Sequence, residues 1–442
     1  MRQTDGELKK GVSLAGIVAL GAGTAIGVAI FSIVAPGAKL AGPGMLLAML
    51  IAGLPMILFA VTYAFMGSAA PVSGASYEWS RRFIHPFVGF IIGWLRILGN
   101  VAALMLYVFV LVQYWSMWID VPAKPTMFAV LTLFWLMNTL GVSLVSRGQA
   151  LMMFVLLATC AVLVVSALPA GTAANFSPVL EQGWMGVFAA VPLMVSLFLG
   201  IETAVEVGEE IRNSRRNIPL GIALSIALTA AIYFSVAAAA LYVLGSGPLG
   251  ESKAPLLDLA NVTLGSWGQP LILLSATVAI GTSLNAISLT FSRTLFAMGR
   301  SGALPAPLAR IHPRFGTPYV ATTAVYLLCL AGLLMPSNLI FLFLAVNIPT
   351  LVKYAATSFA ATRVVSRHPD IYQQASFKFS PAAMQAWAWA GIVCALIVIA
   401  LGWSADWRPY VLLVCWGSLG LLYYFLVVRK RDVAIASAEN TL

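Results

Sequence analysis

Long apolar runs separated by short polar stretches are the most regular feature of this 442-residue sequence. A helix needs about 20 apolar residues to cross the hydrocarbon core of a bilayer, and most of the runs approach that length. We therefore predict an all-α polytopic membrane protein with twelve transmembrane helices. They are placed at residues 12–34, 44–67, 86–113, 126–146, 150–169, 184–208, 218–245, 269–298, 318–336, 338–363, 384–403 and 409–428.

The composition supports a chain that lies in the lipid bilayer. Hydrophobic residues make up 61% of the sequence and charged residues only 9%, and the mean hydropathy is +0.94. These values exclude a soluble globular protein.

The basic residues are distributed unevenly between the two sides that this topology defines. With the N-terminus in the cytoplasm, 19 of the 25 lysines and arginines fall in inside segments and four in outside segments. Arg96 and Lys353 remain within apolar spans. Cytoplasmic loops carry such an excess, so we expect both termini in the cytoplasm and the protein in the cell inner (cytoplasmic) membrane. The net charge of +10 then requires no nucleic-acid partner.

Two carboxylates stand out because they follow an apolar run that begins near Trp184. Glu202 and Glu206 lie one helical turn apart, and acids inside a membrane span are functional candidates. Gly200 precedes them at a place where a helix can break and turn backbone groups toward a ligand. One interpretation is that Glu202 binds the substrate or carries a proton. The other is that it is a structural carboxylate, hydrogen-bonded to hydroxyl groups or paired with a buried base.

The first span is unusually rich in glycine. Gly23 and Gly27 flank Thr24 and Ala25, and each glycine costs about 1 kcal/mol relative to alanine inside a helix. Close helix packing is one explanation. The other is a break between Gly23 and Ala29, which would place polar backbone opposite the break in the sixth span.

Three further polar residues lie in apolar spans. Lys353 in the tenth span needs a partner, which Glu206 could provide, unless its side chain extends to the lipid head groups. Arg96 is interpreted as a scaffold charge. Asn285 in the eighth span could bond either substrate or helix backbone.

The sequence contains no residue pattern typical of an enzyme active site or a metal centre. Its cysteines lie in apolar spans without the spacing of a zinc site or a disulfide framework. They are Cys160, Cys329, Cys394 and Cys415. No nucleophile with a neighbouring base and no phosphate-binding loop is found. We expect no cofactor, no metal and no enzymatic activity.

Four stretches resemble motifs of the amino acid, polyamine and organocation (APC) transporter superfamily. They are Gly23-Thr-Ala-Ile-Gly27-Val-Ala-Ile-Phe31 and residues 63–77, 200–219 and 292–305. Their order and spacing cover most of the chain. The resemblance implies two inverted five-helix repeats at 12–169 and 184–363, followed by two additional helices at 384–428. Residues 1–11 and 429–442 would be the cytoplasmic termini.

In this superfamily the first and sixth helices are discontinuous, and the substrate lies between the repeats. The resemblance therefore implies a substrate site formed by Gly23, Thr24, Ala25, Gly27, Val28, Ala29, Phe198, Gly200, Glu202 and Asn285. Glu202, Glu206 and Lys353 are the candidates for coupling or gating.

Two departures from the superfamily pattern bear on the substrate. Val28 and Ala29 replace a small polar run, and Leu156 stands nearest the position where several members have a lysine. Glu202 matches a Glu of members that exchange arginine or putrescine, which favours a substrate amino group. We expect a secondary active transporter, permease or exchanger, for amino acids or small amines, sodium-independent and with proton coupling left open. A passive channel and a non-transporting membrane sensor are the alternatives, and the oligomeric state is unassigned.

Overall fold

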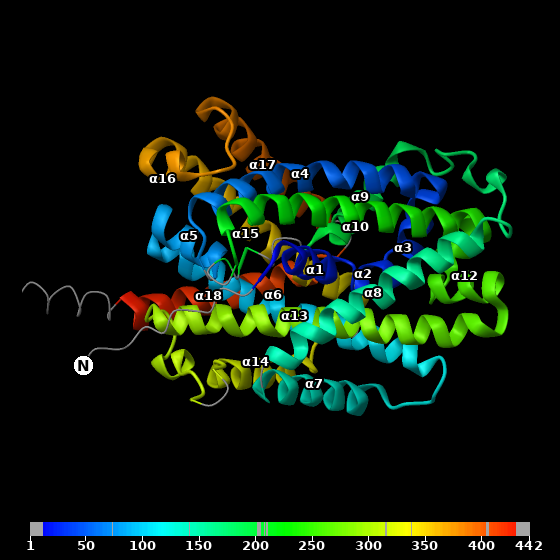
Figure 1. Ribbon diagram of the computed structural model, residues 1–442, viewed down its shortest axis with the longest axis horizontal. Helices are drawn as coiled ribbons and strands as arrows, with labels where there is room; N and C mark the ends of the chain where they lie inside the picture. Colours follow the sequence, from blue (N-terminus) through cyan, green and yellow to red (C-terminus); the bar gives the residue numbers. More distant parts are fainter. Residues whose placement is uncertain are drawn as a thin grey trace, which may run out of the picture.

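The computed structural model describes residues 12–72, 74–140, 142–200, 205–206, 208, 211–313, 316–336, 338–403 and 406–429. The named secondary-structure elements in these residues are all helices. Most of the long helices lie side by side along the long axis of the molecule (Figure 1). Seven stretches within the described residues are long and apolar enough to cross a membrane. The chain is therefore an all-helical, polytopic membrane protein, as predicted.

The long helices follow the apolar runs closely. They are α4 (Met45–Ala69), α6 (Pro86–Ser116), α7 (Ala123–Leu140), α8 (Val142–Ala167), α10 (Ser214–Leu244), α13 (Gly268–Arg300), α15 (Leu339–Arg367) and α17 (Pro381–Gly402). Shorter elements are α5 (Ala75–Phe83), α12 (Pro255–Leu264), α14 (Tyr319–Gly332), α16 (Pro369–Gln374) and α18 (Arg408–Tyr423), which continues as a π-helical turn at Tyr424–Val428.

The first predicted span is a broken helix. It consists of α1 (Leu14–Ala25), α2 (Val28–Ser32) and α3 (Val34–Ala41). The backbone N–H of Ile26 donates to the Ala22 carbonyl and ends α1, and the ψ angle of Gly27 is −107°, outside the helical range. The break predicted between Gly23 and Ala29 is confirmed, although the helical segments continue to Ala41, beyond the predicted end at residue 34.

The helix of the sixth predicted span ends before Gly200. Helix α9 (Gly183–Met194) passes into a 3₁₀ turn at Val195–Phe198, and Leu199 is extended. Gly200 has a φ of +107°, a conformation that a residue with a side chain rarely adopts. The helix of this span therefore ends at Phe198, because the backbone changes direction at Leu199 and Gly200, and residues 201–204 and 207 lie outside the described residues. A break at this glycine is what the sequence indicated.

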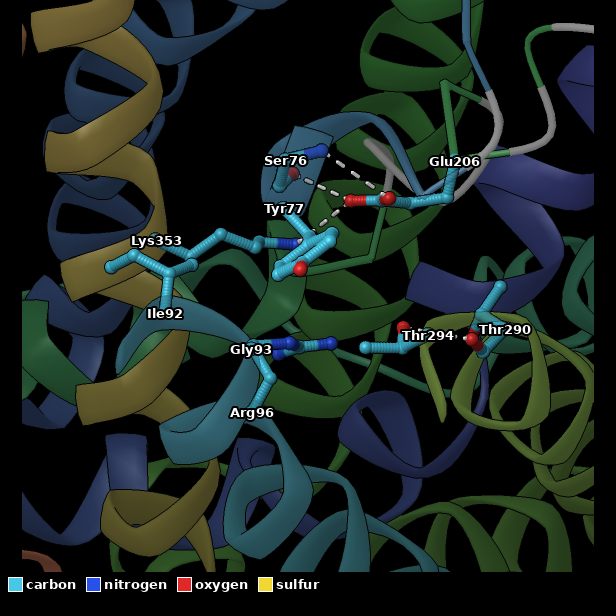
Figure 2. A pocket seen from close by; sticks show the side chains of 9 residues that line it. All are labelled: Ser76, Tyr77, Ile92, Gly93, Arg96, Glu206, Thr290, Thr294 and Lys353. Carbon is cyan, nitrogen blue, oxygen red and sulfur yellow. Dashed lines mark hydrogen bonds and ion pairs between the residues drawn. The ribbon is translucent and has the colours of Figure 1, made fainter. Parts of the chain in front are cut away.

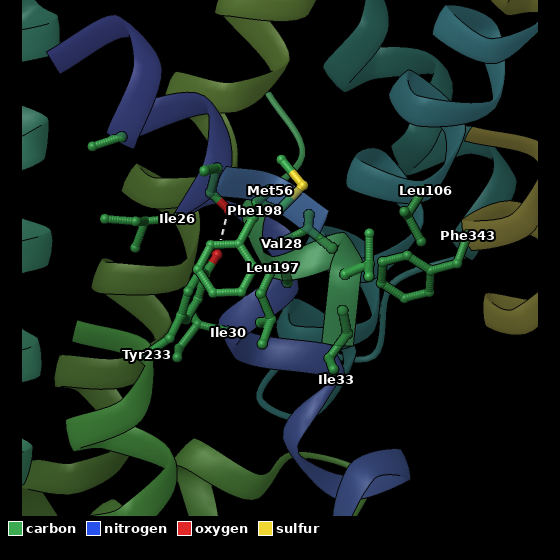
Figure 3. Close-up of a cluster of buried hydrophobic side chains, with 14 of the residues drawn as sticks. Ile26, Val28, Ile30, Ile33, Met56, Leu106, Leu197, Phe198, Tyr233 and Phe343 are labelled. Atoms are coloured by element: carbon green, nitrogen blue, oxygen red, sulfur yellow. Dashed lines mark hydrogen bonds between the residues drawn. The ribbon is translucent and has the colours of Figure 1, made fainter. Parts of the chain in front are cut away.

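The two breaks meet in the interior. Helix α2 contacts both the 3₁₀ turn Val195–Phe198 and α13. Val28, Leu197 and Phe198 lie in one cluster of buried apolar side chains (Figure 3), each no more than 4% exposed.

At one end of the bundle, the segment that follows the sixth-helix break packs against the start of α1. The backbone N–H of Arg212 donates to the Val12 carbonyl at 3.0 Å, within a short parallel bridge between Val12 and Ile211. Gly208 packs so closely on Val72 that a Cβ would lie 2.9 Å from its backbone nitrogen. Helix α5 lies at the same end (Figure 1).

The last two helices attach to different parts of the bundle. Helix α17 packs on α15 and α4, and α18 packs on α6. Trp94 of α6 and Trp416 of α18 donate their indole N–H groups to each other's backbone carbonyl oxygens, at 2.8 Å each.

Candidate functional site

The break between α1 and α2 is shaped by close contact with α13. A Cβ at Gly27 would lie 1.9 Å from Oγ of Ser283 and 2.7 Å from its Cβ. Only glycine therefore allows this contact without a shift of α13. On the other side of the break, the Tyr233 hydroxyl of α10 donates to the Ala25 carbonyl.

Several of the substrate residues implied by the sequence lie at the two breaks, and Asn285 lies on α13. Ala25, Val28, Ala29, Phe198 and Asn285 are all buried, between 1% and 6% exposed. Gly23 and Thr24 belong to α1, and the Thr24 side chain lies outside the described part of the structure. Glu202 also lies outside the described residues.

Asn285 presents a buried polar atom toward the interior. Within the described part of the structure its amide oxygen has no hydrogen-bond partner, although the residue is only 5% exposed. A buried acceptor without a donor costs about 1–3 kcal/mol. An ammonium or hydroxyl donor would remove this cost, but Asn285 is two residues beyond Ser283 on α13 and therefore points about 200° around the helix from the face that contacts Gly27.

Val28 does not line an open approach to the break. Its side chain is 1% exposed and lies in the apolar cluster with Met56, Leu106 and Leu197 (Figure 3). The side chain that replaces a small polar residue therefore belongs to the hydrophobic core.

A second group of predicted residues meets nearer the α5 end of the bundle. Nζ of Lys353 lies 3.9 Å from Oε1 of Glu206, with the two side chains 3% and 14% exposed. Ser76 donates to the same carboxylate from its hydroxyl at 2.5 Å and from its backbone N–H at 3.4 Å. The Gly74 N–H donates to the Glu206 carbonyl at 2.9 Å. The pair thus connects α15, the segment after Gly200 and the start of α5.

Aromatic rings complete the surroundings of Lys353. Its Nζ lies 5.3 Å from the ring centroid of Tyr354 and 6.0 Å from that of Tyr63, distances at which cation–π attraction operates. Lys353 is the fifteenth of the 29 residues of α15. Its side chain is buried in the bundle, so the alternative in which it extends to lipid head groups is wrong.

The Glu206–Lys353 pair forms one wall of a narrow pocket with a volume of about 30 Å³. Figure 2 shows its lining residues, which are Ser76, Tyr77, Ile92, Gly93, Arg96, Glu206, Thr290, Thr294 and Lys353. The walls come from α5, α6, α13, α15 and the segment after the sixth-helix break.

Several of these residues had no role in the sequence analysis. Arg96 was interpreted as a scaffold charge, and Thr290 and Thr294 were not considered. A usable signal exists for the threonines, because they are four residues apart and therefore share one face of an apolar helix. Ser76 lies in the second-helix motif at 63–77, but nothing in that motif indicates contact with Glu206.

Comparison with known proteins identifies the family of this chain. Residues 12–422 match the amino acid permease family. The branched-chain amino acid permease BcaP of Bacillus subtilis (strain 168) is 27% identical over 97% of this chain and 96% of that protein. The methylthioribose transporter of the same organism is 26% identical over 96% and 95%. Its serine/threonine exchanger SteT is 28% identical over 76% and 79%.

The family match begins at the start of α1 and reaches α18, so it includes both helix breaks and both groups of candidate residues. The chain therefore belongs to the amino acid permease family and is a membrane transporter, not an enzyme.

Proposed function

We propose that the protein is a secondary active transporter of amino acids or small amines that works by alternating access in the cytoplasmic membrane. The observation that carries this proposal is the meeting of two helix breaks, at Gly27 and Gly200, in the interior of the bundle. Discontinuous helices at repeat interfaces hold the substrate in transporters of this kind.

The proposal includes an arrangement of twelve crossings with both termini in the cytoplasm. The repeats are residues 12–169 and 184–363, and residues 384–428 form two additional helices outside them. Support comes from the broken first and sixth spans, which occupy equivalent positions in the two repeats. The excess of basic residues in the inside segments supports the orientation.

In this proposal the substrate lies between the breaks. The backbone around Gly23, Thr24 and Gly27 provides polar groups, and Phe198 provides an apolar surface. Glu202 is two residues beyond Gly200 in the sequence. We assign its carboxylate to binding the amino group of the substrate.

Alternating access also requires that the substrate path is closed to one side of the membrane while it is open to the other. The pair Glu206–Lys353 and the bridge between Val12 and Ile211 join the segment after Gly200 to α15 and to the start of α1. We assign both contacts to the closed cytoplasmic gate. Opening to the cytoplasm would separate them.

Neutral amino acids are the favoured substrates. The relatives include proteins named for branched-chain amino acids and for serine and threonine, and the surroundings of the breaks are apolar. Acidic amino acids would place a second carboxylate near Glu202 and be rejected by like charge.

A thermal-stability screen of the purified protein tests the substrate class. A ligand at 100 times its dissociation constant stabilises the folded state by about 2.7 kcal/mol, so neutral amino acids or small amines should raise the unfolding temperature. Leucine, serine, methylthioribose, putrescine and glutamate form an informative set. Stabilisation by glutamate as strong as that by leucine would contradict the assignment of Glu202.

A further inference from the structure

The pocket beside the Glu206–Lys353 pair carries unbalanced charge. Among the described residues, its charged lining side chains are Lys353, Arg96 and Glu206, so in this part of the structure positive charge exceeds negative charge by one at neutral pH. Lys353 already contacts Glu206. The excess therefore resides on Arg96, inside a bundle where an uncompensated charge is costly.

Arg96 is held in place by neutral partners. Its Nη1 donates to Oγ1 of Thr350 and its Nη2 to Oδ1 of Asn100, each at 2.8 Å. Both partners are at most 3% exposed. A guanidinium has five N–H donors, and these two bonds leave others available. In the part of the chain that the structure describes, Arg96 has no ion pair with a carboxylate.

The remaining polar groups of the pocket are already engaged. The hydroxyls of Thr290 and Thr294 donate to carbonyls of their own helix at 3.0–3.1 Å. In Figure 2 Arg96 extends toward Thr294, whereas the Glu206 carboxylate turns toward Ser76 and Lys353. The guanidinium is therefore the donor that a ligand entering this pocket would meet.

We propose that this pocket receives the carboxylate group of an amino acid substrate, which Arg96 binds. A carboxylate accepts two parallel N–H bonds from a guanidinium and neutralises its charge. Thr290 lies seven residues beyond Ser283 on α13, or ~10 Å along the helix. This pocket is thus separate from the helix breaks and is lined in part by Ser76 and Tyr77 of α5.

The inference rests on the proposed function, and it assigns the two ends of the substrate to different places. The helix breaks hold the amino group through Glu202, and the Arg96 pocket receives the carboxylate as the substrate leaves toward the cytoplasm. A small amine without a carboxylate would bind at the breaks but gain nothing from Arg96.

Two fragments of leucine separate the sites in a thermal-stability titration of the purified full-length protein. The probes are 4-methylpentanoate, which lacks the amino group, and isopentylamine, which lacks the carboxylate. We expect the acid to stabilise the wild type, and Arg96→Gln to weaken its apparent affinity roughly ten- to a hundredfold, as for loss of charge-assisted hydrogen bonds. Stabilisation by the amine should be unchanged in this variant.

Two further variants guard against a folding defect. Arg96→Lys keeps the positive charge but cannot form the bidentate hydrogen bonds of a guanidinium. Its affinity for the acid should therefore lie between those of the wild type and Arg96→Gln. Arg408→Gln removes a positive charge outside the pocket and should leave the affinity unchanged. Chloride at the same concentration should stabilise the wild type less than the acid does.

The outcomes distinguish this inference from the proposed function. An acid that fails to stabilise the wild type, or that stabilises Arg96→Gln equally well, would overturn the role of Arg96 in this pocket. Stabilisation by chloride equal to that by the acid would overturn the carboxylate assignment. If the acid response depends on Arg96 but no amino acid or amine is transported by the wild type, the pocket stands and the proposed function fails.

Discussion

Lys353, at the centre of α15, places its ammonium group 3.9 Å from the Glu206 carboxylate, in the segment that follows the sixth-helix break. The two residues are separated by more than a hundred positions in the sequence. Ser76 donates to the same carboxylate, so three parts of the chain are joined through one buried acid.

Loss of either charge in this pair should be more damaging than loss of both. Breaking a buried ion pair from one side costs about 3–5 kcal/mol because the remaining charge is left without its partner. We expect Lys353→Met and Glu206→Gln each to lower the stability measured by unfolding in detergent. The combination Lys353→Met/Glu206→Gln should recover part of the loss.

The pair Asp406–Arg408 provides a matched control for this cycle. Its Nη2–Oδ2 distance is 2.6 Å, but the Arg408 side chain is 50% exposed. The coupling energy of such a pair is about 1 kcal/mol or less. If the stability losses of the Lys353 and Glu206 variants simply add, the coupling energy is no larger than in the control. That result would show that the buried pair contributes no coupling energy.

The contact between Gly27 and Ser283 predicts a specific rescue. Gly27→Ala places a Cβ 1.9 Å from the serine oxygen, and overpacking of this kind costs about 1–3 kcal/mol. Ser283→Gly removes both close atoms and leaves Ala279 O as the neighbour, at 3.6 Å. We therefore expect Gly27→Ala/Ser283→Gly to be more stable than Gly27→Ala alone, by thermal unfolding.

Gly281→Ala is the control for alanine near this contact. Its added Cβ would meet only Phe134 within 4 Å, at an ordinary 3.6 Å, so stability should be unchanged or slightly higher. Equal destabilisation by Gly27→Ala and Gly281→Ala would contradict the close contact at the helix break.

The segment between α17 and α18 should respond to acid. Arg408 donates hydrogen bonds to Asp406 and holds the pKa of this carboxyl below its ordinary value of 3.8. A lowered pKa stabilises the folded state above the ordinary value, and this contribution is lost as the pH falls through the lowered one. The stability difference between the wild type and Asp406→Asn should be constant near neutral pH and narrow below about pH 4. A difference that widens with acid would refute the assignment.

Glu202 is the candidate for proton coupling. If its carboxylate takes up a proton during the cycle, the transport rate of the wild type should depend on pH. Glu202→Gln cannot titrate, so its rate should be lower and its pH profile flat, with unchanged thermal stability. An active variant with the wild-type pH profile would place the proton on another group.

Sequence reasoning predicted the helices best where the apolar runs are continuous. The predicted spans 86–113, 269–298 and 338–363 correspond to α6 (Pro86–Ser116), α13 (Gly268–Arg300) and α15 (Leu339–Arg367). In the sixth predicted span, Val205 and Val207 continue the apolar pattern past Gly200, so hydropathy alone gives no sign of the break. The end at Phe198 depends on backbone geometry at Gly200, which hydropathy does not record.

The candidate site was predictable only in part. Lys353 and Glu206 could be paired from sequence because few other charges lie in apolar spans, and each needs a partner. The pocket around Arg96 could not, since its walls come from helices that are remote in sequence. The hydrogen bonds of Arg96 to Thr350 and Asn100 depend on the packing of α6 against α15.

Counterflow into proteoliposomes tests the central claim that this protein carries a small amino acid or amine across the membrane. Vesicles loaded with unlabelled leucine are diluted into a trace of labelled leucine, and the label inside is followed with time; serine and putrescine are assayed in the same way. A carrier accumulates the label transiently above its equilibrium level, which is the result we predict for at least one substrate. Equilibration without overshoot would indicate a channel, and no uptake of any of them would contradict transport of this substrate class.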